Sequence, residues 1–220
     1  MIYNLLGVEA VQVKSLPSGM AGSRNIDGTF GKDYFDGDRS RGYGGYKDDG
    51  RWAAIAKRLQ ERYRLSGGSK VFELGCAKGF LLKELSVLIP GITVRGFEVS
   101  QYAKETAPES VRNFIDVGYP TTMPYADDTF DLVLAINSLH FMPESDVRRT
   151  FAEVIRISKR EGHVFVQVDA YESNLQYRSM VAWAPIIKTF LTPEQWNKLF
   201  DNEKISVDTF YTIVELEDLR

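Results

Sequence analysis

Residues 71–81 read VFELGCAKGFL, an apolar run followed by an acid and then by a turn rich in small residues. Burial alone gives no reason for Glu73 at the end of the apolar run, because a buried carboxylate is costly. Small residues such as Gly75 and Gly79 let backbone N–H groups approach a ligand, and a following helix adds its positive end. The stretch therefore predicts a ligand site at the end of a buried strand.

The rest of the chain around that stretch alternates between apolar strands and amphipathic helical segments. Such alternation predicts right-handed crossovers and a parallel sheet that is covered on both faces. We therefore expect an α/β fold, a doubly wound, mostly parallel Rossmann-like sheet of six to seven strands with helices on both faces. The tail after Asn202 has room for one strand, so the seventh strand is not assigned. The six expected strands are 71–74, 93–98, 111–115, 130–136, 163–168 and 205–216.

Two regions depart from this alternation. Residues 1–50 form a glycine-rich extension, which is either a flexible segment or a lid whose Tyr43 and Tyr46 close over a pocket. Residues 51–220 are expected to form the ligand-binding domain. Within that domain, 171–191 is expected to be a substrate-side insertion.

The composition is typical of a soluble globular protein. The 220 residues are 44% hydrophobic and 26% charged, with a formal net charge of -3 and both signs interspersed. No concentrated basic region indicates a nucleic-acid partner. Cys76 is the single cysteine, so neither a disulfide framework nor a thiolate metal site is expected. We expect a cytoplasmic protein with no bound metal and no membrane contact, because signal-peptide and membrane-spanning patterns are lacking.

The turn differs from the dinucleotide fingerprint G-x-G-x-x-G, because it reads E-x-G-C-A-K-G and Ala77 replaces the second glycine. An anionic pyrophosphate gains nothing from Glu73, whereas an amino group or a cationic centre does. The next strand ends in Glu98, 23 residues after Gly75, where a carboxylate can accept both hydrogen bonds of a ribose diol. The spacing therefore favours a nucleoside that carries positive charge.

At this point the chain resembles the class I S-adenosylmethionine-dependent methyltransferases with a type-11 methyltransferase domain. The resemblance covers about residues 70–170 and rests on four blocks in order. These blocks are VFELGCAKGF, VRGFEVSQYA, MPYADDTFDLVLAINSLHFM and RTFAEVIRISKREGHVFVQVD. The resemblance implies S-adenosyl-L-methionine as cofactor and S-adenosyl-L-homocysteine as product.

The resemblance also implies which residues bind the cofactor. Glu73 would lie near the amino end of the methionine moiety, and Glu98 would hold the ribose hydroxyls. The remaining expected positions are the turn residues Gly75, Cys76, Ala77 and Gly79, Val99 beside the adenine, and Asn137 and Ser138 on the sulfonium side. One block departs from the family pattern, because Tyr119 and Pro120 occupy the positions of an Asp-Ala pair that reads the adenine edge. Proline has no N–H to donate, so either Asp116 or a nearby amide substitutes, or adenine is held mainly by packing.

Methyl transfer from a sulfonium is an in-line displacement, so much of the catalytic task is positioning the acceptor. A hydroxyl acceptor also needs a base. His140 is a candidate base because imidazole titrates near neutral pH, or it only braces its loop. Asp169 and Tyr171 follow the fifth expected strand, either as base or substrate ligand or as loop-ordering residues. Trp183 forms either a second pocket wall or part of the core.

The function that these patterns favour is methyl transfer from S-adenosylmethionine to a small polar acceptor, at a hydroxyl oxygen of a metabolite or glycan precursor. The alternative is a non-catalytic or regulatory module that binds S-adenosylmethionine or S-adenosylhomocysteine without turnover. A nicotinamide-dependent oxidoreductase is disfavoured, because its glycine spacing is absent and Glu73 would face the phosphates.

Overall fold

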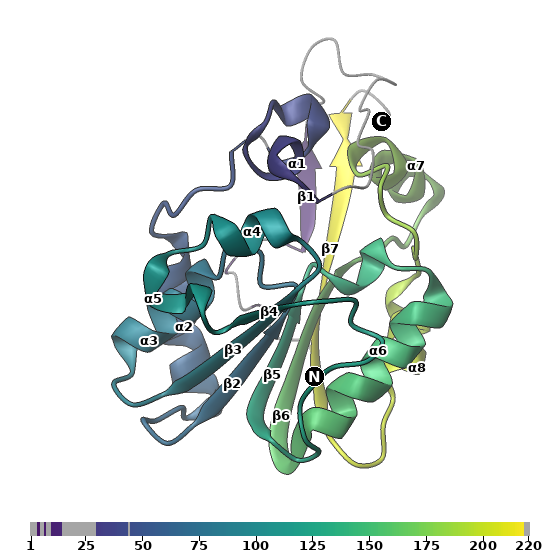
Figure 1. The fold of residues 1–220 in the computed structure, drawn as a ribbon. Coiled ribbons are helices and arrows are strands. Elements are labelled where there is room, and N and C mark those ends of the chain that lie inside the picture. The colour runs from purple at the N-terminus through teal and green to yellow at the C-terminus, as the bar shows by residue number, and fades with distance from the viewer. Residues whose placement is uncertain (1–3, 5–6, 8–9, 15–29, 44, 218–220) are drawn as a thin grey trace.

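The computed structural model describes residues 4, 7, 10–14, 30–43 and 45–217, and a seven-stranded sheet forms its centre (Figure 1). Every strand pairs parallel to its neighbours, in the order β1-β7-β6-β5-β2-β3-β4. The strands are β1 (Val11–Lys14), β2 (Lys70–Leu74), β3 (Thr93–Glu98), β4 (Ile115–Val117), β5 (Phe130–Ile136), β6 (Ser158–Asp169) and β7 (Val207–Leu216). The expected α/β fold with a parallel, doubly covered sheet is confirmed, and the sheet is parallel throughout.

The seventh strand comes from the amino-terminal extension. Strand β1 pairs with β7 in the register Val11↔Ile213, so β1 and not β7 lies at the edge of the sheet. The predicted strand 111–115 is wrong, because Val111 belongs to the short helix α5 (Glu109–Arg112), which Pro108 starts. Only Ile115 of that range lies in β4. An apolar pair spaced by four residues satisfies a helix as well as a short strand.

Helices cover both faces of the sheet. Helices α2 (Arg51–Tyr63) and α3 (Phe80–Leu88) lie on one side, and α6 (Glu144–Ile157) and α8 (Pro193–Phe200) on the other (Figure 1). Beyond the ends toward which the strands point lie α1 (Lys32–Asp36) and α7 (Asn174–Trp183). The remaining elements are α4 (Gln101–Glu105), α5 and the 3-10 turns η1 (Arg39–Arg41) and η2 (Leu139–Phe141).

Strand β5 explains why its sequence, FDLVLAI, is continuously apolar. Val133 and Ala135 point to the face of α6 and α8, whereas Leu132 and Leu134 point to the face of α2 and α3. A strand that is buried on both faces cannot alternate apolar with polar residues. The central position of β5, between β2 and β6, follows from this pattern and brings its carboxyl end beside that of β2.

Removing the Leu134 side chain should be costly, because this fully buried residue (0% exposed) packs between the sheet and the helices. We expect Leu134→Ala to lower the free energy of unfolding by about 2–5 kcal/mol. The matched change Val87→Ala, at a position of α3 that is 71% exposed, should alter it by less than about 0.5 kcal/mol. Chemical denaturation of both variants measures the difference, and equal effects would contradict the assigned core.

Candidate functional site

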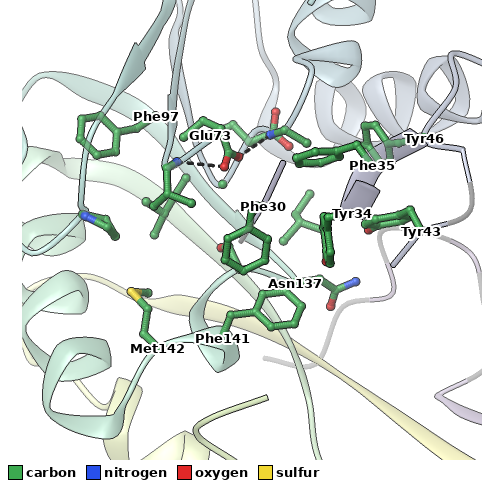
Figure 2. A pocket seen from close by; sticks show the side chains of 18 of the residues that line it. Phe30, Tyr34, Phe35, Tyr43, Tyr46, Glu73, Phe97, Asn137, Phe141 and Met142 are labelled. Atoms are coloured by element: carbon green, nitrogen blue, oxygen red, sulfur yellow. Dashed lines mark hydrogen bonds between the residues drawn. The ribbon is translucent and has the colours of Figure 1, made fainter. Parts of the chain in front are cut away.

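A cavity of about 420 Å³ lies at the carboxyl ends of β2, β3 and β5. Its lining includes Glu73 from the end of β2, Glu98 from the end of β3 and Asn137 directly after β5. Ligands bind at this edge in open parallel sheets. Figure 2 shows Glu73 and Asn137 in this pocket, with Phe97 and Met142 on the side opposite a group of aromatic rings.

The turn after β2 is held in an unusual backbone conformation. Gly75 has φ +69, and a Cβ there would lie 2.5 Å from the Cβ of Ser138, so no side chain is tolerated. Ala77 also has a positive φ, of +50, although it carries a side chain. Its N–H donates a hydrogen bond of 2.8 Å to Oε2 of Glu98. That bond ties the turn of β2 to the end of β3.

Glu98 is buried and organises the backbone around it. Oε1 accepts hydrogen bonds from the N–H groups of Val99 (2.9 Å) and Ser100 (3.0 Å), while Oε2 accepts the bond from Ala77. Burial raises the pKa of the Glu98 carboxyl, and the N–H groups of Ala77, Ser100 and Val99 act in the opposite direction. Because a carboxylate oxygen can accept two hydrogen bonds, Oε2 keeps capacity for a donor in the cavity.

Glu73 is 4% exposed, and its Oε2 has no hydrogen-bond partner among the described residues. Burial raises its pKa well above the usual range, and the nearby Glu98 carboxylate raises it further. An acid that is buried without a partner is a costly arrangement. A cationic group in the cavity would supply the missing partner and favour the ionised carboxylate.

Two further polar atoms near this edge lack a partner. Oδ1 of Asn137 and Oγ of Ser138 are buried and form no hydrogen bond within the described part of the chain. Asn137 has φ +50, so the backbone bends sharply where β5 ends. Together with Glu73, these atoms offer three unused polar positions, as a cavity built for a polar ligand would.

Aromatic residues from the amino-terminal extension line the other side of the cavity. Figure 2 shows Tyr34, Phe35, Tyr43 and Tyr46 grouped there, with Phe30 nearer the middle of the pocket. The Tyr43 and Tyr46 ring centroids lie 4.8 Å apart, and Tyr46 stacks on Phe80 of α3 at 5.3 Å. The described part of the extension therefore packs onto the sheet edge.

A buried ion pair holds this aromatic segment to the glycine turn. Nζ of Lys78 lies 2.6 Å from Oδ2 of Asp36, at the end of α1, and Lys78 is buried. The same carboxylate accepts a hydrogen bond of 2.7 Å from the Tyr102 hydroxyl. Lys78 also donates to the backbone oxygen of Tyr46, at 3.2 Å. The lysine of the E-x-G-C-A-K-G sequence thus anchors the covering segment.

The Tyr119–Pro120 departure lies at the cavity wall, where both residues contribute to the lining. Asp116, one of the two alternatives considered for that end, is not part of the lining. Its Oδ2 accepts a hydrogen bond of 2.6 Å from the Tyr125 hydroxyl. Val99 and Pro120, which line the same cavity, offer surfaces against which a flat ring can pack.

A second cavity, of about 250 Å³, adjoins the first and shares Tyr34, Tyr43, Asn137 and Phe141 with it. Of the candidate catalytic and substrate-side residues from the sequence, it brings four together. These are Tyr43, His140, Asp169 and Trp183.

Three residues that the sequence placed at the site line neither cavity, namely Tyr171, Cys76 and Gly79. Gly79 precedes α3, where a Cβ would lie 3.0 Å from Cδ1 of Ile115. Tyr171 lines neither cavity and packs against Tyr177 and Phe190, with ring centroids 5.1 and 4.9 Å away. The Cys76 side chain also lines neither cavity, because it is buried where a Cβ on Gly96 would lie 2.5 Å from its sulfur. A small buried residue explains Cys76 without a chemical role.

His140 is fixed in one tautomer. Its Nδ1 accepts a hydrogen bond of 3.1 Å from the Asp169 N–H, which leaves the proton on Nε2. Burial lowers the pKa of His140, and the Asp169 carboxylate partly opposes that effect. Nε2 lies 3.8 Å from Oδ2 of Asp169. The neutral ring therefore presents an N–H group, and not a free lone pair, toward Asp169.

Sequence patterns missed much of the lining. Phe141 and Met142 directly follow His140 in the sequence and line the first cavity, but apolar side chains there do not by themselves indicate a pocket. Gln167 lies inside an apolar strand, where one polar residue in the middle of β6 was the only available hint. Other lining residues that the sequence did not predict include Phe30, Tyr34, Phe35, Arg51, Trp52, Ile55, Phe97 and Lys188 in the first cavity, and Gln12, Arg39 and Thr212 in the second.

Within the described ranges, no three histidine, cysteine or acidic side chains gather as metal ligands would. In the same ranges, no helix combines the length and the apolar character that crossing a bilayer requires.

Substituting the unpartnered acid should stabilise the protein in a pH-dependent way. The folded state raises the pKa of Glu73. At a pH above the ordinary glutamate pKa near 4.5, the folded protein therefore keeps a proton on Glu73 that the unfolded chain has released. Stability then falls by about 1.4 kcal/mol for each pH unit between the two pKa values. We expect Glu73→Gln to match the wild type near pH 4 and to exceed it increasingly as the pH rises. Thermal unfolding across pH 4–8 measures this, and a constant difference would contradict it.

Breaking the ion pair of Lys78 should loosen the aromatic segment. The N–H groups of Tyr43 and Tyr46 donate to the backbone oxygens of Tyr34 and Phe35. We expect Lys78→Met to speed hydrogen exchange at these two amides by at least about tenfold, since Asp36 loses its buried partner. Lys57→Met, at an exposed position of α2, is the control. Unchanged exchange in Lys78→Met would show that ring packing alone holds the segment.

Comparison with known proteins finds a family whose model matches the part of the chain that carries the first cavity's polar residues. Residues 72–166 match the model of a methyltransferase domain. The methyltransferase GfsG of Streptomyces halstedii is 36% identical over 110 residues, which are 46% of this chain and 39% of GfsG. The 27-O-demethylrifamycin SV methyltransferase of Amycolatopsis mediterranei is 28% identical over 109 residues, which cover 46% of this chain and 40% of that enzyme. The chain therefore spans about two fifths of the length of these curated relatives.

Solved structures share the fold. The [4+2]-cyclase SpnF superposes with a TM-score of 0.56 at 22% identity, over 67% of this chain and 54% of that chain. At that identity the likeness concerns the fold alone. The family match, by contrast, covers the glycine turn with Glu73, the end of β3 with Glu98 and the loop after β5. The match of residues 72–166 therefore supports the expected S-adenosylmethionine-dependent methyltransferase family, whose cofactor is S-adenosyl-L-methionine.

Proposed function

We propose that this chain transfers a methyl group from S-adenosyl-L-methionine to a hydroxyl oxygen of a small polar acceptor. The observation that carries the proposal is Glu73, a buried acid without a partner that faces a 420 Å³ cavity. A cavity of this size lies within the range of about 300–1,000 Å³ that small-molecule sites occupy. A cofactor with an ammonium group supplies the cation that this acid lacks.

The chain's own residues divide the cofactor site by chemistry. Glu73 would pair with the ammonium group, and Oε2 of Glu98 would accept from the ribose diol through its remaining capacity. The adenine would lie against Val99 and Pro120, in keeping with the engaged Asp116. S-Adenosylmethionine supplies a methyl group on a sulfonium, and S-adenosylhomocysteine is the product that remains.

The acceptor would approach from the second cavity, because Asn137 lines both cavities and marks the junction. The described residues of the proposed lid, 30–43 and 45–50, would exclude water and hold the two molecules in line. Residues 171–191 would form the outer wall on the acceptor side, through Trp183. In this arrangement the described part of the extension lines both cavities, and the insertion lines mainly the acceptor side.

Asp169 is the base that we favour. Its Oδ1 accepts a hydrogen bond of 2.8 Å from the Thr212 hydroxyl, which leaves Oδ2 for a proton from the acceptor. His140 would be a positioning residue, because its Nδ1 is engaged by the Asp169 N–H and its Nε2 faces Oδ2. The name of the rifamycin relative, which methylates an oxygen, supports an oxygen acceptor for this chain.

The alternative is a module that binds the cofactor or its product without turnover. The fold alone does not decide between the two, because one fold serves several functions. Cofactor binding alone is common to both readings. Turnover with a hydroxylated acceptor separates them.

Calorimetric titration of the whole chain with S-adenosylhomocysteine, NAD and NADP tests the cofactor. We expect one-to-one binding of S-adenosylhomocysteine alone, with affinity that rises as the pH rises and with release of a proton, since the ammonium group favours ionised Glu73. Glu98→Ala should weaken binding by at least about tenfold without unfolding the chain. Binding of a nicotinamide nucleotide instead would overturn the proposal.

Asp169→Asn should lower kcat by about 10²-fold or more, because a base for a hydroxyl acceptor contributes about 10²–10⁴-fold. Its affinity for S-adenosylhomocysteine should stay unchanged, since Asp169 lines only the second cavity. Tyr171→Phe is the control, because Tyr171 lines neither cavity. Production of S-adenosylhomocysteine from a panel of hydroxylated acceptors measures both variants. Full turnover by Asp169→Asn would remove Asp169 as the base.

A further inference from the structure

We propose that the second cavity selects acceptors that carry two neighbouring hydroxyl groups, with one oxygen methylated beside Asp169 and the other held by Gln167. This inference rests on the proposed function, because it names the acceptor of that same site. The carrying observation is the Gln167 side chain. It is 0% exposed, it lines the second cavity, and neither its Oε1 nor its Nε2 has a hydrogen-bond partner among the described residues.

A fully buried amide without partners is costly, so a native chain keeps one where a ligand completes it. The contrast within this protein is Gln176, another buried glutamine. Its Oε1 accepts from the Glu172 N–H at 2.7 Å, and its Nε2 donates to the Glu215 carboxylate at 2.9 Å. Gln176 is thus satisfied by the protein itself, as a structural glutamine should be.

The position of Gln167 in the sheet is fixed. Its backbone lies in register with Ile136 of β5 and Phe210 of β7, and its carbonyl accepts the Asn137 N–H at 2.9 Å. A side chain so placed cannot turn to solvent. Gln167 and Asp169 are two residues apart on β6, and both line the same cavity, about 6.6 Å apart along the strand.

The donors and acceptors at the two positions match a pair of hydroxyl groups. The amide of Gln167 both donates and accepts, as a hydroxyl group does, whereas the Asp169 carboxylate only accepts. One hydroxyl group would therefore form two complementary bonds with Gln167. Its neighbour would donate its proton to Asp169, and an electron pair of that oxygen would form the bond to the methyl carbon. The bond from that carbon to sulfur would break at the same time, so that S-adenosylhomocysteine leaves as a neutral thioether.

The remaining walls suit the carbon skeleton of a compact acceptor. Phe141, Trp183, Ile186 and Val214 give the cavity apolar sides. Trp183 is itself held in place, since the Arg39 guanidinium lies 5.3 Å from its ring centroid. The volume of about 250 Å³ favours a ring-sized molecule.

The test uses the full chain saturated with S-adenosylhomocysteine and two probes, cis-1,2-cyclohexanediol and cyclohexanol. The probes differ by one hydroxyl group and share the ring. Ligand-observed NMR titration gives both affinities. We expect the diol to bind at least about tenfold more tightly, because a site with a buried polar group rejects an analogue that leaves the group unpaired.

Gln167→Met keeps the length of the side chain and removes the amide. We expect it to abolish the preference for the diol, to leave the affinity for S-adenosylhomocysteine unchanged, and to raise the Tm of the free protein, since an unpaired buried amide is lost. Gln101→Met, at an exposed position of α4, should change none of the three readouts.

The outcomes separate this inference from the proposed function. If the wild type does not bind S-adenosylhomocysteine, the proposed function falls and this inference falls with it. If it binds but shows no preference for the diol, or if Gln167→Met keeps the preference, the proposed function stands and this inference is wrong. A lower Tm for Gln167→Met would also contradict it, because Gln167 would then be satisfied within the free protein.

Discussion

The Glu98 carboxylate is the interaction on which the site depends. It accepts three hydrogen bonds from the backbone N–H groups of Ala77, Val99 and Ser100. These bonds connect the turn after β2 to the turn after β3. The hydrogen bond from the Ala77 N–H helps to hold Ala77 at its unfavourable positive φ. The same carboxylate raises the pKa of Glu73, so the two acids at this edge have different tasks. The Glu98 carboxylate accepts hydrogen bonds from backbone N–H groups, whereas Oε2 of Glu73 has no partner among the described residues.

The central strands could be predicted from the sequence because their burial on both faces requires continuous apolar runs. FDLVLAI is apolar on both faces because β5 is covered on both faces. Gly75 and Gly79 occupy the turn because both have a positive φ, which residues with a side chain rarely adopt. The ends of the sheet were harder. Strand β1 is four residues long and partly exposed, and its pairing with β7 depends on contacts about 200 positions away in the chain, which no local pattern encodes.

The two cavities also differed in how much the sequence could reveal. Glu73 and Glu98 stand out because acids at the ends of apolar strands violate burial rules, and the structure places both in the first cavity. His140 is a candidate base from its residue type and from its place after the fourth expected strand. Its tautomer depends on the N–H of Asp169, 29 positions later, which only the folded chain reveals. The same holds for Gln167, because the lack of hydrogen-bond partners for its side-chain amide can be recognised only in the folded structure.

The covering segment connects the two cavities physically. Tyr34 and Tyr43 line both, so any movement of this segment changes both at once. Lys78, in the glycine turn, holds the segment through Asp36, and the Ser100 hydroxyl, next to the bonds of Glu98, donates to the backbone oxygen of Phe30. The turns that would contact the cofactor therefore also position the walls that would contact the acceptor.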